Sequence, residues 1–278
     1  MDLRLISDTA SDLTKEMIDE RHIGLVPFKM DVGEEHFVDD WMDTMALIRA
    51  MKASEEGLTT SCPSPHDYLE ALRKEKDGEG ILILTISSRL SGSFNAAKTA
   101  KDLFAEECDT PVYVLDSKSA GAGPSLLLLE LSEKRAQVAS FDAWCRFGEE
   151  FVEKMETFFV LESLENLRKN GRLGKVTTRI GRALHIRPLM HGKDGEIELY
   201  ELTRGFKRSL KKMANAVEKL VRAPEECRVY ITHVNAEEKA QLLRDLILEK
   251  MSVREIIITP ARGLSTAYGD DGGVIIAF

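Results

Sequence analysis

The chain has 278 residues, 43% of them hydrophobic, and carries a formal net charge of −9. This length predicts one large or two medium domains with real cores, and the acidic balance argues against non-specific binding to nucleic acid or to anionic membranes. The first residues are too short and too acidic for a signal peptide, and no apolar run approaches the roughly 20 residues of a membrane span. We therefore expect a cytoplasmic protein. The four scattered cysteines predict reduced, structural thiols.

The N-terminal half alternates between strand-like and helical patterns. Apolar, strand-like runs occupy residues 3–6, 24–30, 80–86 and 112–115, and helical patterns lie near 44–54, 65–75, 93–104, 126–136 and 141–155. Such βα repetition predicts a parallel sheet with helices packed on it. Another apolar run begins at Phe158, and we therefore expect an N-terminal α/β domain over 1–158 and a C-terminal one over 159–278.

The C-terminal half carries a hairpin signal. Apolar runs at 186–190 and 197–202 flank Lys193-Asp194-Gly195-Glu196, and Asp-Gly between two such runs favours a tight antiparallel turn. The chain continues with a helix over 207–221, a strand over 228–232, a helix over 236–251 and strands over 255–259 and 274–278. This order predicts a mixed sheet.

Two hydroxyl-rich segments, 59–65 and 87–95, each precede a predicted helix. The second follows the apolar run 80–86, which places Ser91, Gly92 and Ser93 at the carboxyl end of a buried strand, where open α/β sheets bind ligands. Unpaired N–H groups at a helix start and nearby hydroxyl donors favour an oxyanion. Each segment alone is more typical of a helix cap than of a ligand site, with Pro65 in the first turn of the helix after the first segment.

Four motifs in order resemble the DegV family, bacterial fatty-acid-binding proteins that serve as binding subunits of fatty-acid kinase. The motifs are Ile6-Ser7-Asp8-Thr9-Ala10-Ser11-Asp12-Leu13, Thr60-Ser61-Cys62-Pro63-Ser64, Ser87 to Ala97, and Val114-Leu115-Asp116-Ser117 with Gly121 and Gly123. Each motif is weak alone, but their order and βα context together are specific. The resemblance covers nearly the whole chain.

The resemblance implies a two-domain α/β fold, with a parallel-sheet N-terminal domain, a mixed-sheet C-terminal domain and a long-chain fatty acid between them. It also implies that the carboxylate is held by Thr60, Ser61 and the turn from Ser91 to Ser93. A partner fatty-acid kinase would form the acyl phosphate, so this chain would be a lipid-binding subunit without catalytic residues, cofactor or metal. Transient contact with a membrane is compatible with that role. Acyl-chain length is not determined by the sequence.

Two arginines are candidates for partner contact. Arg172 lies in Asn170-Gly171-Arg172, where the family usually has Gly-Gly-Arg, and asparagine tolerates the left-handed backbone of such a turn. Arg204 lies near Lys207, Arg208, Lys211 and Lys212, a basic group that suits an acidic partner or a nucleotide phosphate. Most such charge runs are only solvated surfaces, and a structural arginine is an equal interpretation of Arg172.

The clearest departure from the family lies near the carboxyl end. Tyr268-Gly269-Asp270-Asp271 replaces the usual His-x-Gly-Pro-Gly. The hydroxyl of Tyr268 can still donate to a carboxylate, whereas the two aspartates would repel one if they pointed inward. A neutral or differently charged ligand therefore remains open.

The remaining polar residues allow other roles, and the sequence allows one rival function. Asp8 and Asp12 are expected to cap the first helix, and Asp116 and Ser117 are balanced between capping a loop and lining the cleft. The main rival function is a phosphate- or small-anion-binding, phosphotransferase-like protein that uses the Ser91–Ser93 turn. The histidines show no spacing that supports a serine-hydrolase triad, and no metal-site motif is present.

Overall fold

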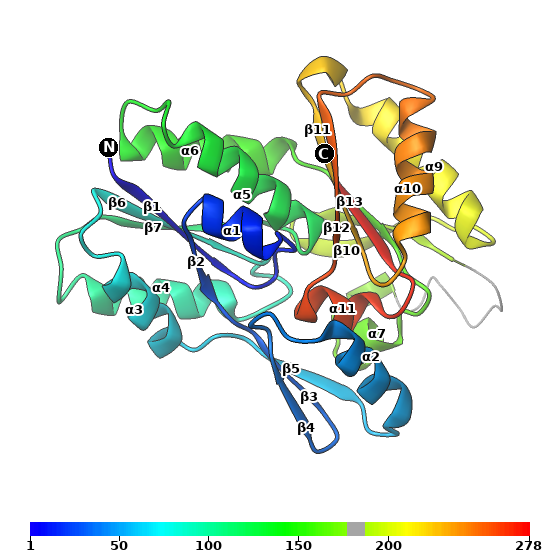
Figure 1. Ribbon diagram of the computed structural model, residues 1–278, viewed down its shortest axis with the longest axis horizontal. Helices are drawn as coiled ribbons and strands as arrows, with labels where there is room; N and C mark the ends of the chain where they lie inside the picture. The colour runs from blue at the N-terminus through cyan, green and yellow to red at the C-terminus, as the bar shows by residue number, and fades with distance from the viewer. Residues whose placement is uncertain (177–186) are drawn as a thin grey trace.

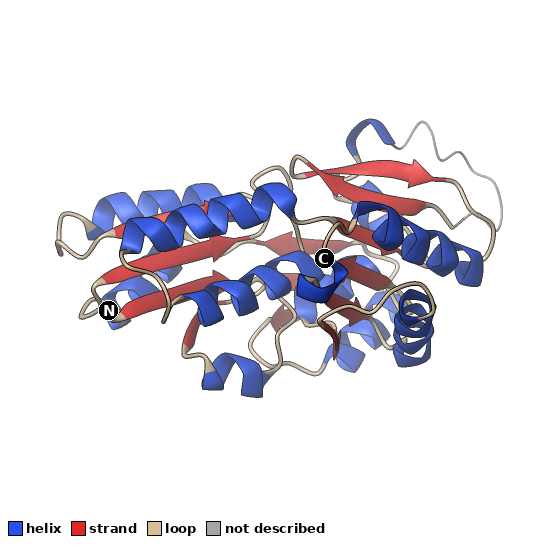
Figure 2. Cartoon of the chain, turned by 90° about the horizontal axis from the view of Figure 1, so that it is seen from above, coloured by secondary structure: helices blue, strands red, loops and turns tan. Residues whose placement is uncertain are grey.

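The computed structural model describes residues 1–176 and 187–278, which form three β-sheets flanked by helices (Figures 1 and 2). The first sheet, ordered β2-β1-β6-β7, is parallel throughout. Its strands are β1 (Leu3–Asp8), β2 (Ile23–Val26), β6 (Gly80–Thr85) and β7 (Val112–Asp116). Every residue of β6 is buried, because helices cover both faces of the sheet. Helices α3 (Pro65–Lys74) and α4 (Ser93–Phe104) pack on one face, and α5 (Ala122–Lys134) and α6 (Phe141–Lys154) on the other.

The second sheet is mixed and has the order β10-β9-β8-β13-β11-β12. Its strands are β8 (Thr157–Val160), β9 (Leu189–Lys193), β10 (Glu196–Glu201), β11 (Arg228–His233), β12 (Glu255–Pro260) and β13 (Val274–Ala277). Helices α9 (Phe206–Leu220) and α10 (Glu237–Leu248) cover one face. Helix α5 reaches the other face, since its leucines share a core with Tyr230 and Ala277. The predicted α/β class, with a parallel and a mixed sheet, is confirmed.

A small antiparallel sheet, ordered β4-β3-β5, was not predicted. It contains β3 (Lys29–Val32), β4 (Glu35–Val38) and β5 (Leu58–Ser61). The single strand expected over 24–30 is wrong, because the chain breaks at Pro27 into β2 and β3. Thr60 and Ser61 lie on β5, a strand, rather than in the predicted turn. Four-residue strands carry too few side chains for a period of two to be recognised.

Helix α2 (Thr44–Ala53) was expected, and α1 (Lys15–Glu20) is the first helix that Asp8 and Asp12 were expected to cap, although its bounds were not predicted. Among the described residues, two further short helices, α7 (Glu165–Lys169) and α11 (Gly263–Gly269), were not expected. The domain boundary expected after residue 158 falls inside β8, and the division of the chain into domains stays a prediction.

The predicted hairpin is confirmed for β9 and β10, although residue 186, the expected first residue of its first strand, lies outside the described residues. Asp194 and Gly195 both have positive φ, at 50° and 84°, as a tight hairpin turn requires. The turn contacts the loop after β6, where the Ser87 hydroxyl donates to the carbonyl oxygen of Gly195 at 2.7 Å. The β9–β10 turn of the mixed sheet thus contacts the loop at the carboxyl end of β6 in the parallel sheet.

Arg228 joins helix α5 to the mixed sheet. Its side chain is 6% exposed and donates to Glu130, Glu133 and Glu255 at 2.6–2.7 Å. We expect Arg228→Leu to lower the free energy of unfolding by about 2–3 kcal/mol, because Glu130 would keep a largely buried charge with weaker compensation. Urea denaturation measures this loss.

The matched control is Arg254→Leu. Arg254 contacts two of the same glutamates, but its side chain is 44% exposed, so solvent screens the pair. We expect this variant to lose less than about 1 kcal/mol. Equal losses in the two variants would contradict a special contribution from the buried arginine.

Candidate binding site

A cavity of about 180 Å³ lies where the carboxyl ends of the parallel strands meet the mixed sheet. The loops that follow β1, β6 and β7 form one wall, as expected for an open α/β sheet. Strands β8 and β13, the β9–β10 hairpin and helix α11 form much of the opposite side, and Phe28, Thr60 and Cys62 from the region of the small sheet and Leu167 and Arg172 from α7 and the segment after it complete the lining. Its apolar lining residues include Ala10, Phe28, Ile86, Leu90, Ala120, Phe159, Leu161, Leu167, Ile197, Leu264 and Ile275. The lining is predominantly hydrocarbon.

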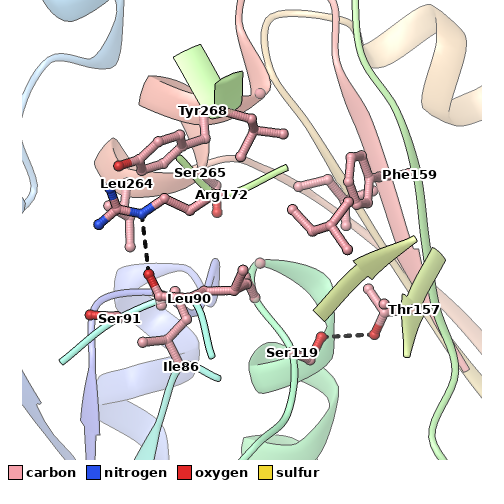
Figure 3. Close-up of a pocket in the computed structure, with 18 of the residues that line it drawn as sticks. Ile86, Leu90, Ser91, Ser119, Thr157, Phe159, Arg172, Leu264, Ser265 and Tyr268 are labelled. Atoms are coloured by element: carbon pink, nitrogen blue, oxygen red, sulfur yellow. Dashed lines mark hydrogen bonds between the residues drawn. The ribbon is translucent and has the colours of Figure 1, made fainter. Parts of the chain in front are cut away.

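Several polar groups gather at one end of this cavity (Figure 3). The hydroxyls of Thr60 and Tyr268 lie 2.7 Å apart, although the residues are 208 positions apart in sequence. Ser91 and Arg172 line the same cavity, and Arg172 Nε donates to the carbonyl oxygen of Leu90 at 3.2 Å. Its Nη1 donates to the carbonyl oxygen of Asn170. Nη2 has no hydrogen-bond partner within residues 1–176 and 187–278, so it retains protons for an anion.

Of the other predicted site residues, one lines the cavity and three do not. Gly92 lines the cavity, whereas Ser61 is exposed and does not. Ser93 is fully buried, and its hydroxyl donates to Asp8 at 2.7 Å and lies 2.6 Å from that of Tyr68. Arg204 is exposed and lies outside the cavity lining. The structure therefore brings Thr60, Ser91, Gly92, Arg172 and Tyr268 together, and leaves Ser61, Ser93 and Arg204 outside.

Asp8 and Asp12 do not cap the first helix, so that expectation is wrong. Thr14 is the cap, accepting from the backbone N–H of Met17 at 3.3 Å. Asp8 and Asp12 instead are fully buried behind the cavity. Asp12 accepts from the backbone N–H of Arg262 at 2.8 Å and from the Ser265 hydroxyl at 2.9 Å. Burial raises the pKa of Asp8 to about 6 and that of Asp12 to about 7.

The remaining acidic candidates point to structural roles. Asp116 accepts from the backbone N–H groups of Ser88 and Lys118, at 3.1 and 2.9 Å, and thus caps its loop. Neither Asp116 nor Ser117 lines the cavity. Asp270 and Asp271 do not line it either, and Asp271 pairs with Lys52, whose hydrogen bond holds the pKa of that carboxyl below its usual range. They therefore do not repel an anion in the cavity by direct contact.

Sequence reasoning missed part of the lining. Ser119 and Thr157 are buried in the wall, and Ser265 reaches it from helix α11. Ser119 lies two residues after Ser117 of the recognised Asp116-Ser117 motif, which was a usable signal. Thr157 and Ser265 had none, because only the packing of β8 and α11 against the parallel sheet brings them there.

Within the described ranges 1–176 and 187–278, no group of three histidine, cysteine or acidic side chains is arranged to hold a metal ion. In those same ranges, no helix has the length and apolar character needed to cross a lipid bilayer.

These features define an α/β protein with a largely apolar cavity and a group of hydrogen-bond donors at one end of it. The family model DegV, described as an uncharacterised protein of the DegV family, matches residues 2–277. A DegV domain-containing protein of Streptococcus pneumoniae is 35% identical over 256 residues, covering 91% of this chain and 89% of that protein. Another, from Streptococcus gordonii, is 31% identical and covers 100% of this chain and 99% of its own. The chain belongs to the DegV family.

Solved structures share the fold. A DegV family protein from Ruminococcus gnavus, described with vaccenic acid, has a TM-score of 0.95 and 33% identity, covering 100% of both chains. The Fatty Acid Kinase (Fak) B3 protein of Streptococcus pneumoniae, loaded with linoleic acid, has a TM-score of 0.90 and 31% identity, covering 100% of this chain and 99% of that one. A Eubacterium eligens relative loaded with heptadecanoic acid has a TM-score of 0.88 at 27% identity, covering 99% and 98%.

Proposed function

We propose that this protein is a non-catalytic lipid carrier that binds one long-chain fatty acid in the cavity between the two large sheets. The observation that carries the proposal is the cavity itself, with an apolar lining and donors gathered at one end. The three solved relatives described above each carry a fatty acid. A fatty acid has the same division between a long apolar tail and one polar group.

The carboxylate is assigned to the end that contains Thr60 and Tyr268. An ionised carboxylate loses its hydration on entering the cavity, so it needs several donors in return. The two hydroxyls share one hydrogen bond, which leaves one of their two protons for the ligand. Ser91 adds a hydroxyl and Arg172 Nη2 adds a positive charge. Charge-assisted hydrogen bonds of this kind are the stronger ones.

The tail is expected to supply most of the affinity. At about 0.8 kcal/mol per buried methylene, fourteen methylenes contribute at most about 11 kcal/mol before association and ordering costs are subtracted. The hydrogen bonds at the head then mainly fix the orientation of the carboxylate. Fixed orientation matters because phosphoryl transfer requires the attacking oxygen to lie in line with the leaving group.

We further propose that a fatty-acid kinase is the partner and that the complex acts in the cytoplasm. The description of one relative as a fatty-acid-kinase B protein supports this assignment. Arg204 lies with exposed Lys207, Arg208 and Lys211 at the start of α9. This basic group would match an acidic surface of the kinase and speed the encounter. Contact with a membrane would be transient, for loading the fatty acid.

The phosphate-binding alternative has weaker support. A phosphate cradle at the start of α4 would need free backbone N–H groups, but the Ser93 N–H already donates to the Ser91 hydroxyl at 3.2 Å. The apolar lining of the cavity would also be unused by a small anion.

Native mass spectrometry of the purified protein, followed by solvent extraction, tests the proposal. We expect one long-chain fatty acid per chain, and its identity reports the preferred acyl chain. An empty protein that also fails to take up oleate or palmitate would overturn the carrier assignment. Binding of inorganic phosphate under those conditions would favour the alternative.

The double variant Thr60→Val, Tyr268→Phe tests the head-group assignment. We expect roughly tenfold weaker fatty-acid binding, because each lost neutral hydrogen bond contributes about 1 kcal/mol or less. Kinase-dependent formation of the acyl phosphate should fall further, since orientation is lost. Fluorescence competition with a labelled fatty acid measures the affinity.

Ser61→Ala is the matched control, because Ser61 adjoins Thr60 on β5 but is exposed and outside the cavity lining. It should bind like the wild type. Unchanged affinity in the double variant would place the carboxylate elsewhere.

A further inference from the structure

Two buried hydroxyls interrupt the apolar wall away from the head-group end. Ser119, in the loop before α5, and Thr157, the first residue of β8, line the cavity and are 5% and 6% exposed. Their hydroxyl oxygens lie 2.8 Å apart. Figure 3 shows the pair across the pocket from Tyr268 and Arg172, on the same side as Phe159. A hydrocarbon tail that leaves the head-group end would therefore pass these hydroxyls.

The surrounding backbone fixes the position of the pair. Ser119 is held by a hydrogen bond from the backbone N–H of Ser87 to its carbonyl oxygen, at 2.8 Å. Gly123 provides the space, since a Cβ there would lie 2.0 Å from Ser119 Oγ and 3.0 Å from Thr157 Oγ1. Any larger residue at 123 would displace both hydroxyls. The wall is thus built around this pair.

Without a ligand, one hydroxyl proton of the Ser119–Thr157 pair has no acceptor among the described residues. Two hydroxyls carry two protons, and their mutual hydrogen bond uses one. Across the described part of the chain, neither hydroxyl has any other partner. The second proton is therefore available to a ligand in the cavity that both hydroxyls line. A plain methylene chain would bury this proton unpaired, which disfavours such a ligand, whereas an oxygen on the chain would accept it.

We propose that the preferred ligand of this protein is a long-chain fatty acid that carries a hydroxyl group along its chain, with that oxygen bound by Ser119 and Thr157. The proposal rests on the fatty-acid-binding function and names its substrate class. Sites built to hydrogen-bond a ligand hydroxyl discriminate strongly against the analogue that lacks it, because their own polar groups are then left unpaired.

Competition binding of stearate and a positional series of monohydroxystearates to the whole protein tests this. At least one positional isomer is expected to bind about tenfold more tightly than stearate, and the position of its hydroxyl reports the depth of the pair. In Thr157→Val, which keeps the shape of the side chain, the preference for that isomer over stearate should disappear. Thr85→Val is the control, since Thr85 has an equally buried, unpartnered hydroxyl in β6 outside the cavity lining.

The outcomes separate the two proposals. A wild-type protein that binds stearate as tightly as every hydroxy isomer would overturn this inference and leave the carrier function intact. A preference that survives Thr157→Val would also overturn it. If neither stearate nor any isomer binds, the carrier function itself fails. Thermal unfolding checks each variant, and Ser119→Ala, which should show the same loss of preference, replaces Thr157→Val if the latter does not fold.

Discussion

Replacing Gly192 with leucine is expected to weaken fatty-acid binding by roughly a hundredfold while the protein stays folded. Gly192 lines the cavity and pairs with Thr157 across β9 and β8, so side chains at the two positions share the cavity face. A Cβ at 192 would meet Thr157 Cβ at 3.5 Å, an ordinary contact, and φ is not in the left-handed region. The added side chain can therefore enter the cavity without displacing backbone.

The expected loss of affinity in Gly192→Leu follows from the part of the acyl chain that the leucine would displace. A leucine side chain occupies the space of about four methylenes, and at about 0.8 kcal/mol each the lost burial is roughly 3 kcal/mol, or about a hundredfold in affinity. Titration with oleate, read by competition with a fluorescent fatty acid, measures the change.

The control for this variant is Gly57→Leu. Gly57 is exposed, and a Cβ there would have only Lys169 Cδ nearby, at 3.9 Å. Its binding should match the wild type. Wild-type affinity in Gly192→Leu would show that the acyl chain does not occupy this cavity.

The contribution of Asp12 to the free energy of unfolding should fall as the pH rises from about 4 to about 8, and Asp12→Asn should remove that contribution. Burial raises the pKa of Asp12 to about 7 from an ordinary value of 3.8. The folded protein therefore holds a proton in this window that the unfolded chain releases. The stabilisation is complete below the ordinary pKa and is lost as the pH passes through 7. Three pKa units correspond to about 4 kcal/mol as an order of magnitude.

Asparagine at position 12 keeps an oxygen to accept the N–H of Arg262 but does not titrate. Urea unfolding at several pH values isolates the contribution of Asp12 as the difference between wild type and variant. Asp8, whose pKa burial raises to about 6, should give the same sign over a lower range. Asp77→Asn, at an exposed position, serves as the control. An Asp12→Asn variant with the pH dependence of the wild type would contradict the raised pKa.

The sequence was sufficient for the class of fold and for the outline of the site. The almost continuously apolar run 80–86 and its neighbours predicted a parallel sheet, because a strand covered on both faces is apolar on both sides rather than alternating. The Asp194-Gly195 turn predicted the hairpin, because few residues adopt positive φ. Thr60 and Ser91 could be selected because local motifs placed them in hydroxyl-rich segments beside helices.

Which of these groups share the cavity depends on the packing of elements that are distant in sequence. Ser91 and Ser93 are two residues apart, yet one lines the cavity and the other donates to buried Asp8. The contact between Thr60 and Tyr268 joins β5 to α11, two elements that sequence periodicity did not reveal. Thr157 lines the cavity because β8 packs beside the loop that carries Ser119. Local sequence determines backbone preference and burial pattern, whereas the meeting of distant side chains depends on how whole elements pack, and no short motif encodes that packing.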